Sequence, residues 1–206
     1  MMQLQRLRDR IDGIDRQIID LLNERLEQAV MLRKLKPATR DAAREAAVLR
    51  HVQGLCKRLV SPELARQLYM LIMAESRGLQ DRAFTVAGFQ GQRGSDGEAA
   101  AGHWDKAAVA VPVPSFADLF DGLEAGVFDY GVVPAEDSRA GIVDQVNELL
   151  RQRDVTVVAV LDMDASHGAV KPLAAQLDGL ELGKGAVQGQ GGSRFFVVAR
   201  RNAQPD

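Results

Sequence analysis

The chain has 206 residues, of which 46% are hydrophobic and 26% charged, with a formal net charge of -2. This composition is typical of soluble globular proteins, and without a basic surplus there is no electrostatic reason to expect nucleic-acid binding. One cysteine, Cys56, excludes an internal disulfide, and neither a signal peptide nor a membrane-spanning run is recognisable. The sequence predicts a cytoplasmic protein that binds neither nucleic acid nor membrane.

The first part of the chain, up to residue 82, shows helical periodicity throughout. Three helices are predicted: one from about Leu4 to Lys36, a second that begins near Asp41, and a third that follows Ser61 as its N-cap. The first would be roughly 50 Å long, which is too long for two shorter helices to cover. We therefore expect two copies of the chain to interlock.

Polar residues interrupt the apolar stripe of this first predicted helix. Arg25 and Gln28 take the next positions of the repeat, Leu32 restores it, and Lys36 lies one turn further on. Arg25 and Lys36 share a face about three turns apart, so their side chains are placed to grip opposite ends of a small ligand. The apolar stripe consists of Leu4, Leu7, Ile11, Ile14, Ile18 and Leu21.

The other two predicted helices also place polar side chains where a core is expected. Asp41, Arg44 and Glu45 share a face of the second, and an apolar row of the third ends in Ser76 and Gln80. Each alone has a commoner explanation, such as a solvated face or the end of the core. Because an unpaired buried charge costs several kcal/mol, the three together indicate an anionic ligand.

Residues 4–82 resemble the all-helical chorismate mutase domain of the AroQ class. The matching stretches are LRDRIDGIDRQIIDLLNER, RDAARE and LIMAESRGLQ, with Lys36 between the first two. The resemblance implies an all-α three-helix domain in an intertwined homodimer, which converts chorismate to prephenate by a Claisen rearrangement without cofactor or metal. The site residues that it implies are Arg8, Arg25, Lys36, Asp41, Arg44, Glu45, Ser76 and Gln80.

The same resemblance gives these residues roles. Arg25 would bind one carboxylate of chorismate in bidentate fashion, and Arg8 would reach in from the other subunit. Lys36 and Gln80 would donate to the ether oxygen, where charge develops, and Glu45 would accept from the ring hydroxyl. Arg25, Lys36, Glu45 and Gln80 are thus the expected catalytic residues. The pocket would be completed by Asp41, Arg44 and Ser76.

The loop between Lys36 and Asp41 departs from the family pattern. It has only the four residues PATR, fewer than the family usually has, so we expect weaker closure over the substrate and a raised Michaelis constant. Two alternatives stay open. One is an isochorismate–pyruvate lyase or aminodeoxychorismate mutase of the same fold, against which Glu45 argues. The other is a non-catalytic helical dimer that binds or regulates a partner, which the short loop favours.

Residues 83–206 alternate β-rich runs with helical stretches, which predicts a small α/β domain. Glycine is dense just after the first run, in GFQGQRGSDG, where backbone N–H groups can bind an anion, although a plain loop is the commoner meaning. The three histidines are scattered, so no metal site is predicted. The predicted strands are FTVAGF, AVAVPV, YGVVPA, VTVVAVLDM and RFFVVAR, and the predicted helices are SFADLFDGLEAG and DQVNELLRQR.

This second segment is similar to the start of a prephenate dehydratase domain. The family's Thr-Arg-Phe motif reads Ser-Arg-Phe at residues 193–195, and its Glu-Asn-(Ser/Thr) signature reads Glu-Asp-Ser at 136–138. Only about thirty residues separate VLDM from SRFF, where the family has a whole second lobe. The resemblance therefore implies a truncated, degenerate dehydratase-like domain, which we expect to be a scaffold or docking module rather than an active dehydratase.

Overall fold

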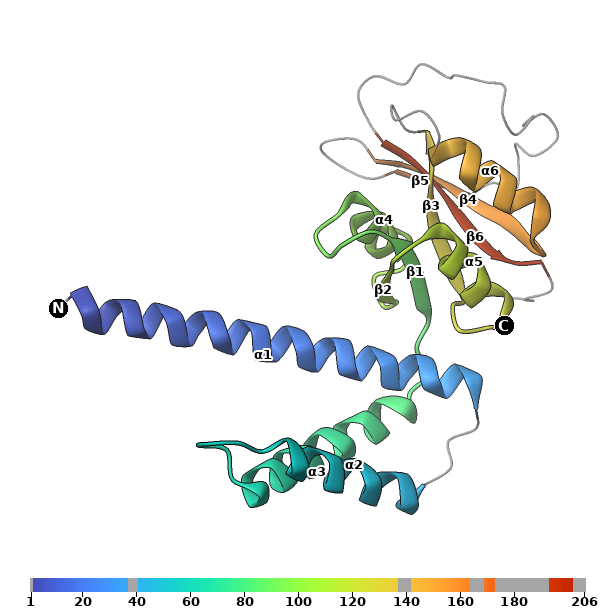
Figure 1. Cartoon of the computed structure of the whole chain (residues 1–206). Helices are drawn as coiled ribbons and strands as arrows, with labels where there is room; N and C mark the ends of the chain where they lie inside the picture. Colours follow the sequence, from blue (N-terminus) through green and yellow to red (C-terminus); the bar gives the residue numbers. More distant parts are fainter. Residues whose placement is uncertain (1, 37–40, 137–141, 164–168, 173–192, 202–206) are drawn as a thin grey trace. The chain divides into compact units, whose positions relative to one another are not determined.

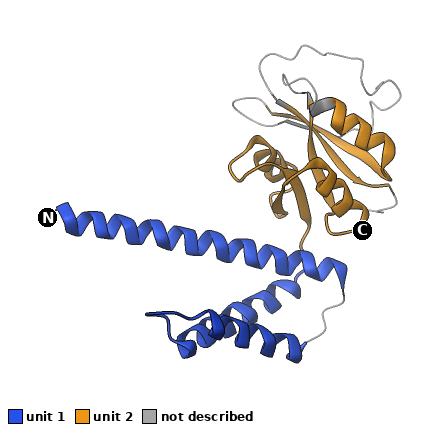
Figure 2. Cartoon of the chain, in the orientation of Figure 1, with its two compact units in different colours: residues 1–83 blue, residues 84–206 orange. Residues whose placement is uncertain are grey.

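The computed structural model describes residues 2–36, 41–136, 142–163, 169–172 and 193–201 (Figure 1). The chain divides into two compact units, residues 1–83 and residues 84–206 (Figure 2). The first unit consists of α1 (Met2–Leu35), α2 (Ala42–Leu55) and α3 (Pro62–Gln80). The second consists of β1 (Val86–Gln90), α4 (Asp96–Trp104), β2 (Val109–Val113), α5 (Phe116–Glu124), β3 (Tyr130–Glu136), α6 (Ile142–Gln152), β4 (Val155–Met163), β5 (Ala169–Pro172) and β6 (Ser193–Arg200).

The predicted three helices of the first unit are confirmed, and side-chain caps set where two of them begin. The Asp41 carboxylate accepts a hydrogen bond from the Arg44 backbone N–H at 2.8 Å, so Asp41 is the N-cap of α2. Ser61 caps α3 in the same way, with its hydroxyl accepting from Leu64 N–H at 3.1 Å. Proline follows at the first helical position, where its missing N–H has no cost.

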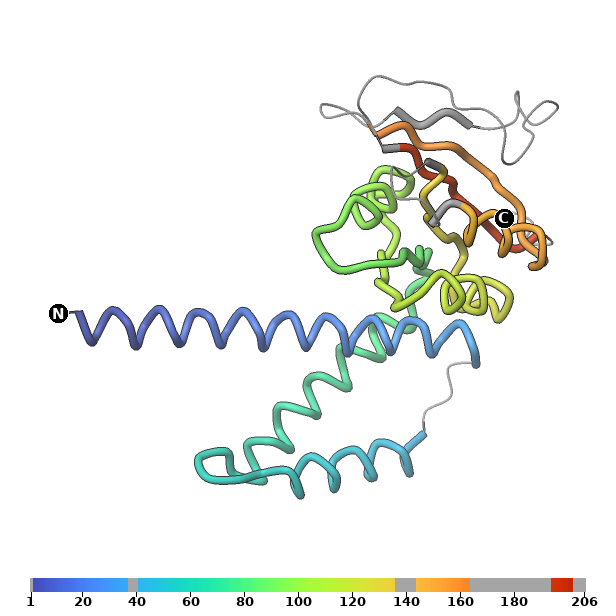
Figure 3. Tube along the Cα trace, turned by 45° about the horizontal axis from the view of Figure 1, so that its top comes forward, coloured from blue at the N-terminus to red at the C-terminus, as the bar shows by residue number. Residues whose placement is uncertain are grey.

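A single copy leaves the long first helix largely uncovered. The stripe residues from Leu4 to Leu21 are between 47% and 63% exposed, and among the described residues of α1 only Val30 is buried. The N-terminal end of α1 extends beyond the turn that joins α2 and α3 (Figure 3). An exposed apolar stripe of this length is typical of a surface that another molecule covers.

The second unit is built on one six-stranded sheet with the order β2-β1-β3-β6-β4-β5. Strand β1 pairs in parallel with β2 and β3, whereas β6 is antiparallel to both of its neighbours, β3 and β4. All five predicted strands and both predicted helices are present. Helix α4 and strand β5 were not predicted. Helix α4 begins inside the glycine-dense stretch GFQGQRGSDG, which is more typical of a loop, and its small residues hide the helical period.

Helices cover both faces of this sheet. The side chains of Ala87 and Phe89 on β1 belong to a buried cluster with Ala100 and Ala101 of α4. The alternate residues point the other way, so that a Cβ added at Gly131 of β3 would lie 2.5 Å from the Leu119 side chain of α5. Alternation within each strand thus gives this unit a closed core of its own.

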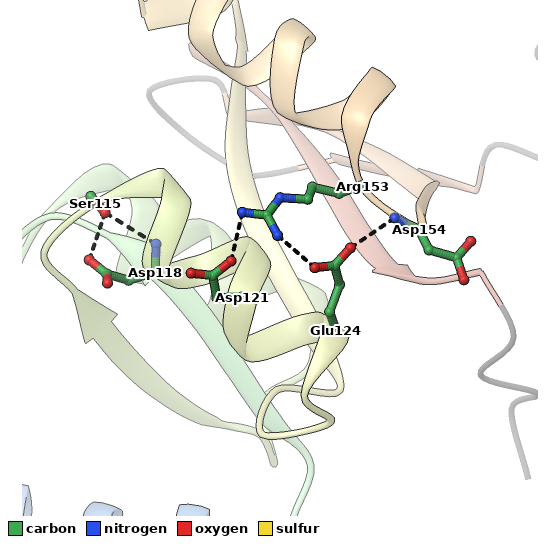
Figure 4. A network of polar contacts seen from close by, with 6 residues as sticks. All are labelled: Ser115, Asp118, Asp121, Glu124, Arg153 and Asp154. Atoms are coloured by element: carbon green, nitrogen blue, oxygen red, sulfur yellow. Dashed lines mark hydrogen bonds and ion pairs between the residues drawn. The ribbon is translucent and has the colours of Figure 1, made fainter.

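A charged network joins α5 to the turn after α6 (Figure 4). Arg153 pairs with Asp121 at 2.7 Å and with Glu124 at 2.8 Å, and the second oxygen of Glu124 accepts from Asp154 N–H at 3.0 Å. The backbone hydrogen bond from Asp154 has the largest influence on the pKa of Glu124 and lowers it. Desolvation comes next and raises this pKa, but the hydrogen bond and the charge of Arg153 lower it again, so the net shift is downward. The network fixes how α6 leads into β4.

Candidate active site

Arg25 extends from α1 toward α3. Its Nη1 donates to the Ser76 hydroxyl at 2.9 Å, and that hydroxyl donates its own hydrogen to Ile72 O at 2.8 Å. The guanidinium carbon lies 5.7 Å from the centre of the Tyr69 ring, within the range of a cation–π contact. Ser76 is only 8% exposed, so the arginine that interrupts the apolar stripe is turned into the protein.

A second polar contact joins the same two helices one turn further along. Gln80 Nε2 donates to the Ala29 carbonyl at 2.8 Å, and Gln80 and Ala29 lie four residues beyond Ser76 and Arg25, respectively. The two contacts therefore form successive rungs between α1 and α3. A side-chain amide has two N–H donors, so Gln80 keeps one for a further acceptor.

Glu45 on α2 is held by a residue that sequence reasoning missed. Its Oε1 accepts from Arg77 Nη1 at 2.8 Å, in an ion pair whose side chains are 28% and 43% exposed. Tyr69 was missed as well. It lies two turns before Ser76 on the same face of α3, which is the signal that was available for it. For Arg77 the only signal was its place next to Ser76.

The remaining predicted site residues are not brought together with these within one chain. Lys36 is exposed just past the end of α1, and its carbonyl accepts from Arg33 at 3.4 Å. Asp41 serves as a helix cap and Arg44 is exposed. Arg8 precedes Arg25 by seventeen residues of continuous helix, a rise of roughly 25 Å, so the two arginines of one chain do not reach the same small ligand.

The arrangement suits a small anion. Arg25 uses one of its five N–H donors on Ser76, and a guanidinium binds carboxylates in a two-pronged geometry. Among the described residues no cluster of three or more histidine, cysteine or acidic side chains is placed to hold a metal ion. No helix in the described part of the chain has the length and apolarity needed to cross a membrane.

The glycine-dense loop after β1 binds a carboxylate of its own chain. Glu98 of α4 accepts from Gly94 N–H at 2.6 Å through one oxygen and pairs with Arg93 at 3.0 Å through the other. In the antiparallel part of the same sheet, Arg194 of β6 pairs with Asp162 of the neighbouring strand β4 at 2.5 Å. Residues 137 and 138, which continue the predicted signature after β3, lie outside the described residues.

Two family models match the chain. Residues 7–81 match chorismate mutase type II, and residues 87–182 match prephenate dehydratase. The chain joins a type II chorismate mutase domain to a prephenate dehydratase family domain. The predicted resemblance and the predicted order of an all-helical domain followed by a small α/β domain are thereby confirmed. The contacts of Arg25, Gln80 and Glu45 all lie within the mutase domain.

Curated relatives combine the same two domains. The bifunctional chorismate mutase/prephenate dehydratase of Stutzerimonas stutzeri is 30% identical over 175 residues, which cover 80% of this chain and 47% of that protein. The protein of that name in Neisseria gonorrhoeae is 35% identical over 145 residues, covering 69% and 40%. The chain thus spans about half the length of the curated relatives it matches. The solved prephenate dehydratase of Streptococcus mutans aligns at 18% identity with a TM-score of 0.40, covering 56% of this chain and 49% of that one.

Proposed function

We propose that the chain is a chorismate mutase, which converts chorismate to prephenate in the helical domain of a homodimer. The observation that carries this proposal is the inward position of Arg25, with its guanidinium on the Ser76 hydroxyl and over the Tyr69 ring. A cation turned inward from a helix whose neighbouring stripe is apolar is explained by an anion that completes the interior. The match of residues 7–81 to the mutase family supports the same substrate.

The reaction asks for positioning and electrostatics rather than proton transfer. Chorismate carries two carboxylates, an ether oxygen and a ring hydroxyl, and it rearranges through a compact chair-like conformer. Arg25 binds one carboxylate and so restricts the substrate to that conformer. Lys36 and the free donor of Gln80 stabilise the negative charge that develops on the ether oxygen. Glu45 accepts from the ring hydroxyl. Asp41, Arg44 and Ser76 line the rest of the pocket.

The geometry of α1 supports the proposed homodimer. Arg8 is roughly 25 Å along the helix from Arg25, and the stripe from Leu4 to Leu21 is about half exposed in one copy. A second copy with its first helix crossing α1 covers the stripe and brings its own Arg8 to the pocket. Both features have one explanation, in which the site is complete only in the dimer.

The test is the conversion of chorismate to prephenate by the purified chain. We expect Arg25→Ala to lower kcat/KM by a factor of about 100 to 1000, the usual cost of losing one preorganised charge donor, and Lys36→Ala to act similarly. Arg50→Ala, which removes an exposed arginine of α2, is the matched control and retains activity. The absence of prephenate at high enzyme concentration rejects the proposal.

Two other functions are tested by the same preparation. A lyase acting on isochorismate releases pyruvate, so assays with both substrates separate it from a mutase. A non-catalytic dimer, which the exposed Lys36 and the four-residue loop after it favour, binds neither substrate detectably and loses nothing in Arg25→Ala.

The α/β domain is not an active dehydratase in this proposal. Glu98 occupies the Gly94 N–H of the glycine-dense loop and pairs with Arg93, so donors that would meet an anionic substrate are already used. Arg194 of the Ser-Arg-Phe motif is likewise paired with Asp162. The test is the formation of phenylpyruvate from prephenate. We expect none from the wild-type chain, and its appearance would refute this part of the proposal.

A further inference from the structure

We propose that Arg77 is a positioning residue that orients the Glu45 carboxylate for the ring hydroxyl of the substrate. The inference rests on the mutase function proposed above and adds a residue that the sequence did not predict. The ion pair connects two helices: Arg77 belongs to the last turn of α3, and Glu45 to the first turn of α2. Their side-chain atoms Nη1 and Oε1 are 2.8 Å apart.

The pair leaves half of the carboxylate available. Arg77 bonds Oε1, whereas Oε2 bonds no side chain or backbone group among the described residues. An ionised carboxylate has about four acceptor sites, so it can take a substrate hydroxyl while it holds the arginine. The Glu45 backbone is also fixed, because its N–H donates to Asp41 O at 2.9 Å. Only the side-chain torsions remain to be restricted, and the ion pair restricts them.

Arg77 also stands next to the residue that orients Arg25. Consecutive residues of a helix point about 100° apart, so Ser76 reaches α1 while Arg77 reaches α2. The Ser76 hydroxyl accepts from Arg25, and Arg77 donates to Glu45. One short stretch of α3 therefore orients both a cation for a substrate carboxylate and an acceptor for the substrate hydroxyl. A shift of α3 would move the two together.

A purely structural role is a weaker explanation of the pair. Both side chains are partly exposed, at 43% and 28%, and ion pairs of this kind contribute little to folding stability. Removing Arg77 should therefore leave the fold intact and change the chemistry. The effect should also depend on Glu45, because Arg77 acts through that carboxylate.

The experiment is a double-mutant cycle on chorismate turnover with Arg77→Met, Glu45→Gln and the double variant. We expect Arg77→Met alone to lower kcat/KM about tenfold, which is a coupling of ordinary size for residues in contact. In the Glu45→Gln background the same change should have no further effect. Arg77→Lys should restore most of the activity, and Arg66→Met, at an exposed arginine three turns earlier on α3, should match the wild type.

Several results overturn the inference. One such result is full activity of the Arg77→Met variant. Another is an Arg77→Met change that lowers kcat/KM by the same factor in the wild type and in the Glu45→Gln variant. Thermal unfolding of every variant shows whether a lost activity is a lost fold, and Arg77→Gln replaces Arg77→Met if the latter does not fold. An active wild type with an unaffected Arg77→Met defeats this inference alone, whereas an inactive wild type defeats the proposed function itself.

Discussion

The two units of the chain differ in how they satisfy their apolar surface. The α/β unit closes its own core, with Phe89, Phe120 and Val197 fully buried between the sheet and its helices. The helical unit leaves most of α1 uncovered, and its apolar stripe averages about half exposed in one copy. One unit is therefore closed in a single chain, whereas the other leaves an apolar stripe that the proposed homodimer would cover.

The units also differ in what their polar groups do. In the helical unit, Arg25, Gln80 and Glu45 each connect two helices and keep donors or acceptors unused by the described residues. In the α/β unit, the polar groups of the motif regions bond one another, as Glu98 does with Arg93. The contacts alone thus distinguish polar groups that keep unused donors or acceptors from polar groups that bond one another.

The largest expected effect comes from a charge in the stripe. In a twofold-symmetric dimer, Ile18→Glu places one new carboxylate from each copy in the interface. Each unpaired charge costs several kcal/mol to bury. We expect the dimer dissociation constant to rise at least about a thousandfold, which is ~4 kcal/mol, with loss of mutase activity. Light scattering after size exclusion measures the oligomeric state.

The matched control for this variant is Arg16→Gln, which changes the net charge by the same amount on the opposite face of α1. We expect it to remain dimeric and active. A monomeric but fully active Ile18→Glu variant would contradict both the dimer and the contribution of Arg8 across subunits.

The next effect falls on the other unit. Phe120 of α5 is completely buried, and truncating a buried phenylalanine to alanine costs about 3–5 kcal/mol. We expect Phe120→Ala to lower the unfolding temperature of the α/β unit and to leave chorismate turnover unchanged below that temperature. Calorimetry on the full chain measures the first and a kinetic assay the second. Parallel loss of both would show that the mutase domain depends on the α/β core.

A smaller effect is expected at Tyr69. Tyr69→Leu removes the ring beside Arg25, and a cation–π contact of about 0.5–1 kcal/mol corresponds to a two- to fivefold loss in kcat/KM. Tyr69→Phe keeps the ring face and is the control that separates the ring from the phenol. If Tyr69→Phe and Tyr69→Leu lowered kcat/KM equally, the phenol hydroxyl rather than the ring would be the group that supports turnover.

Local rules predicted much of this structure. Ser61 caps α3 as its side-chain chemistry indicates, and the run VTVVAVLDM is strand β4 from end to end. The inward position of Arg25 follows from the interrupted stripe. The Glu45–Arg77 pair did not follow, because it depends on the distance between two helices, which periodicity along one helix does not contain. Helix α4 was missed because Gly97, Gly102 and the alanines between them give no amphipathic pattern.

The smallest expected effect is on the stability of the α/β unit, and it comes from a change at Glu124. Its pKa is lowered in the folded state by the Asp154 N–H and by Arg153. A carboxyl group whose pKa is lowered in the folded state stabilises the fold fully when the pH is above its ordinary pKa of 4.5. This contribution is lost as the pH falls through the folded-state pKa. Glu124→Gln should therefore be less stable than the wild type at pH 7, and the difference should close in acid.

Urea unfolding of the α/β unit, at pH 7 and in acid, measures the difference in the free energy of unfolding between Glu124→Gln and the wild type. The control is Glu148→Gln, whose ion pair with Arg151 stays within one helix and joins no two elements. A gap between Glu124→Gln and wild type that persists unchanged in acid would mean that the ionised carboxylate is not the stabilising species. The stabilisation would then come from contacts that the protonated carboxyl group of Glu124 also makes and that the amide of the variant does not.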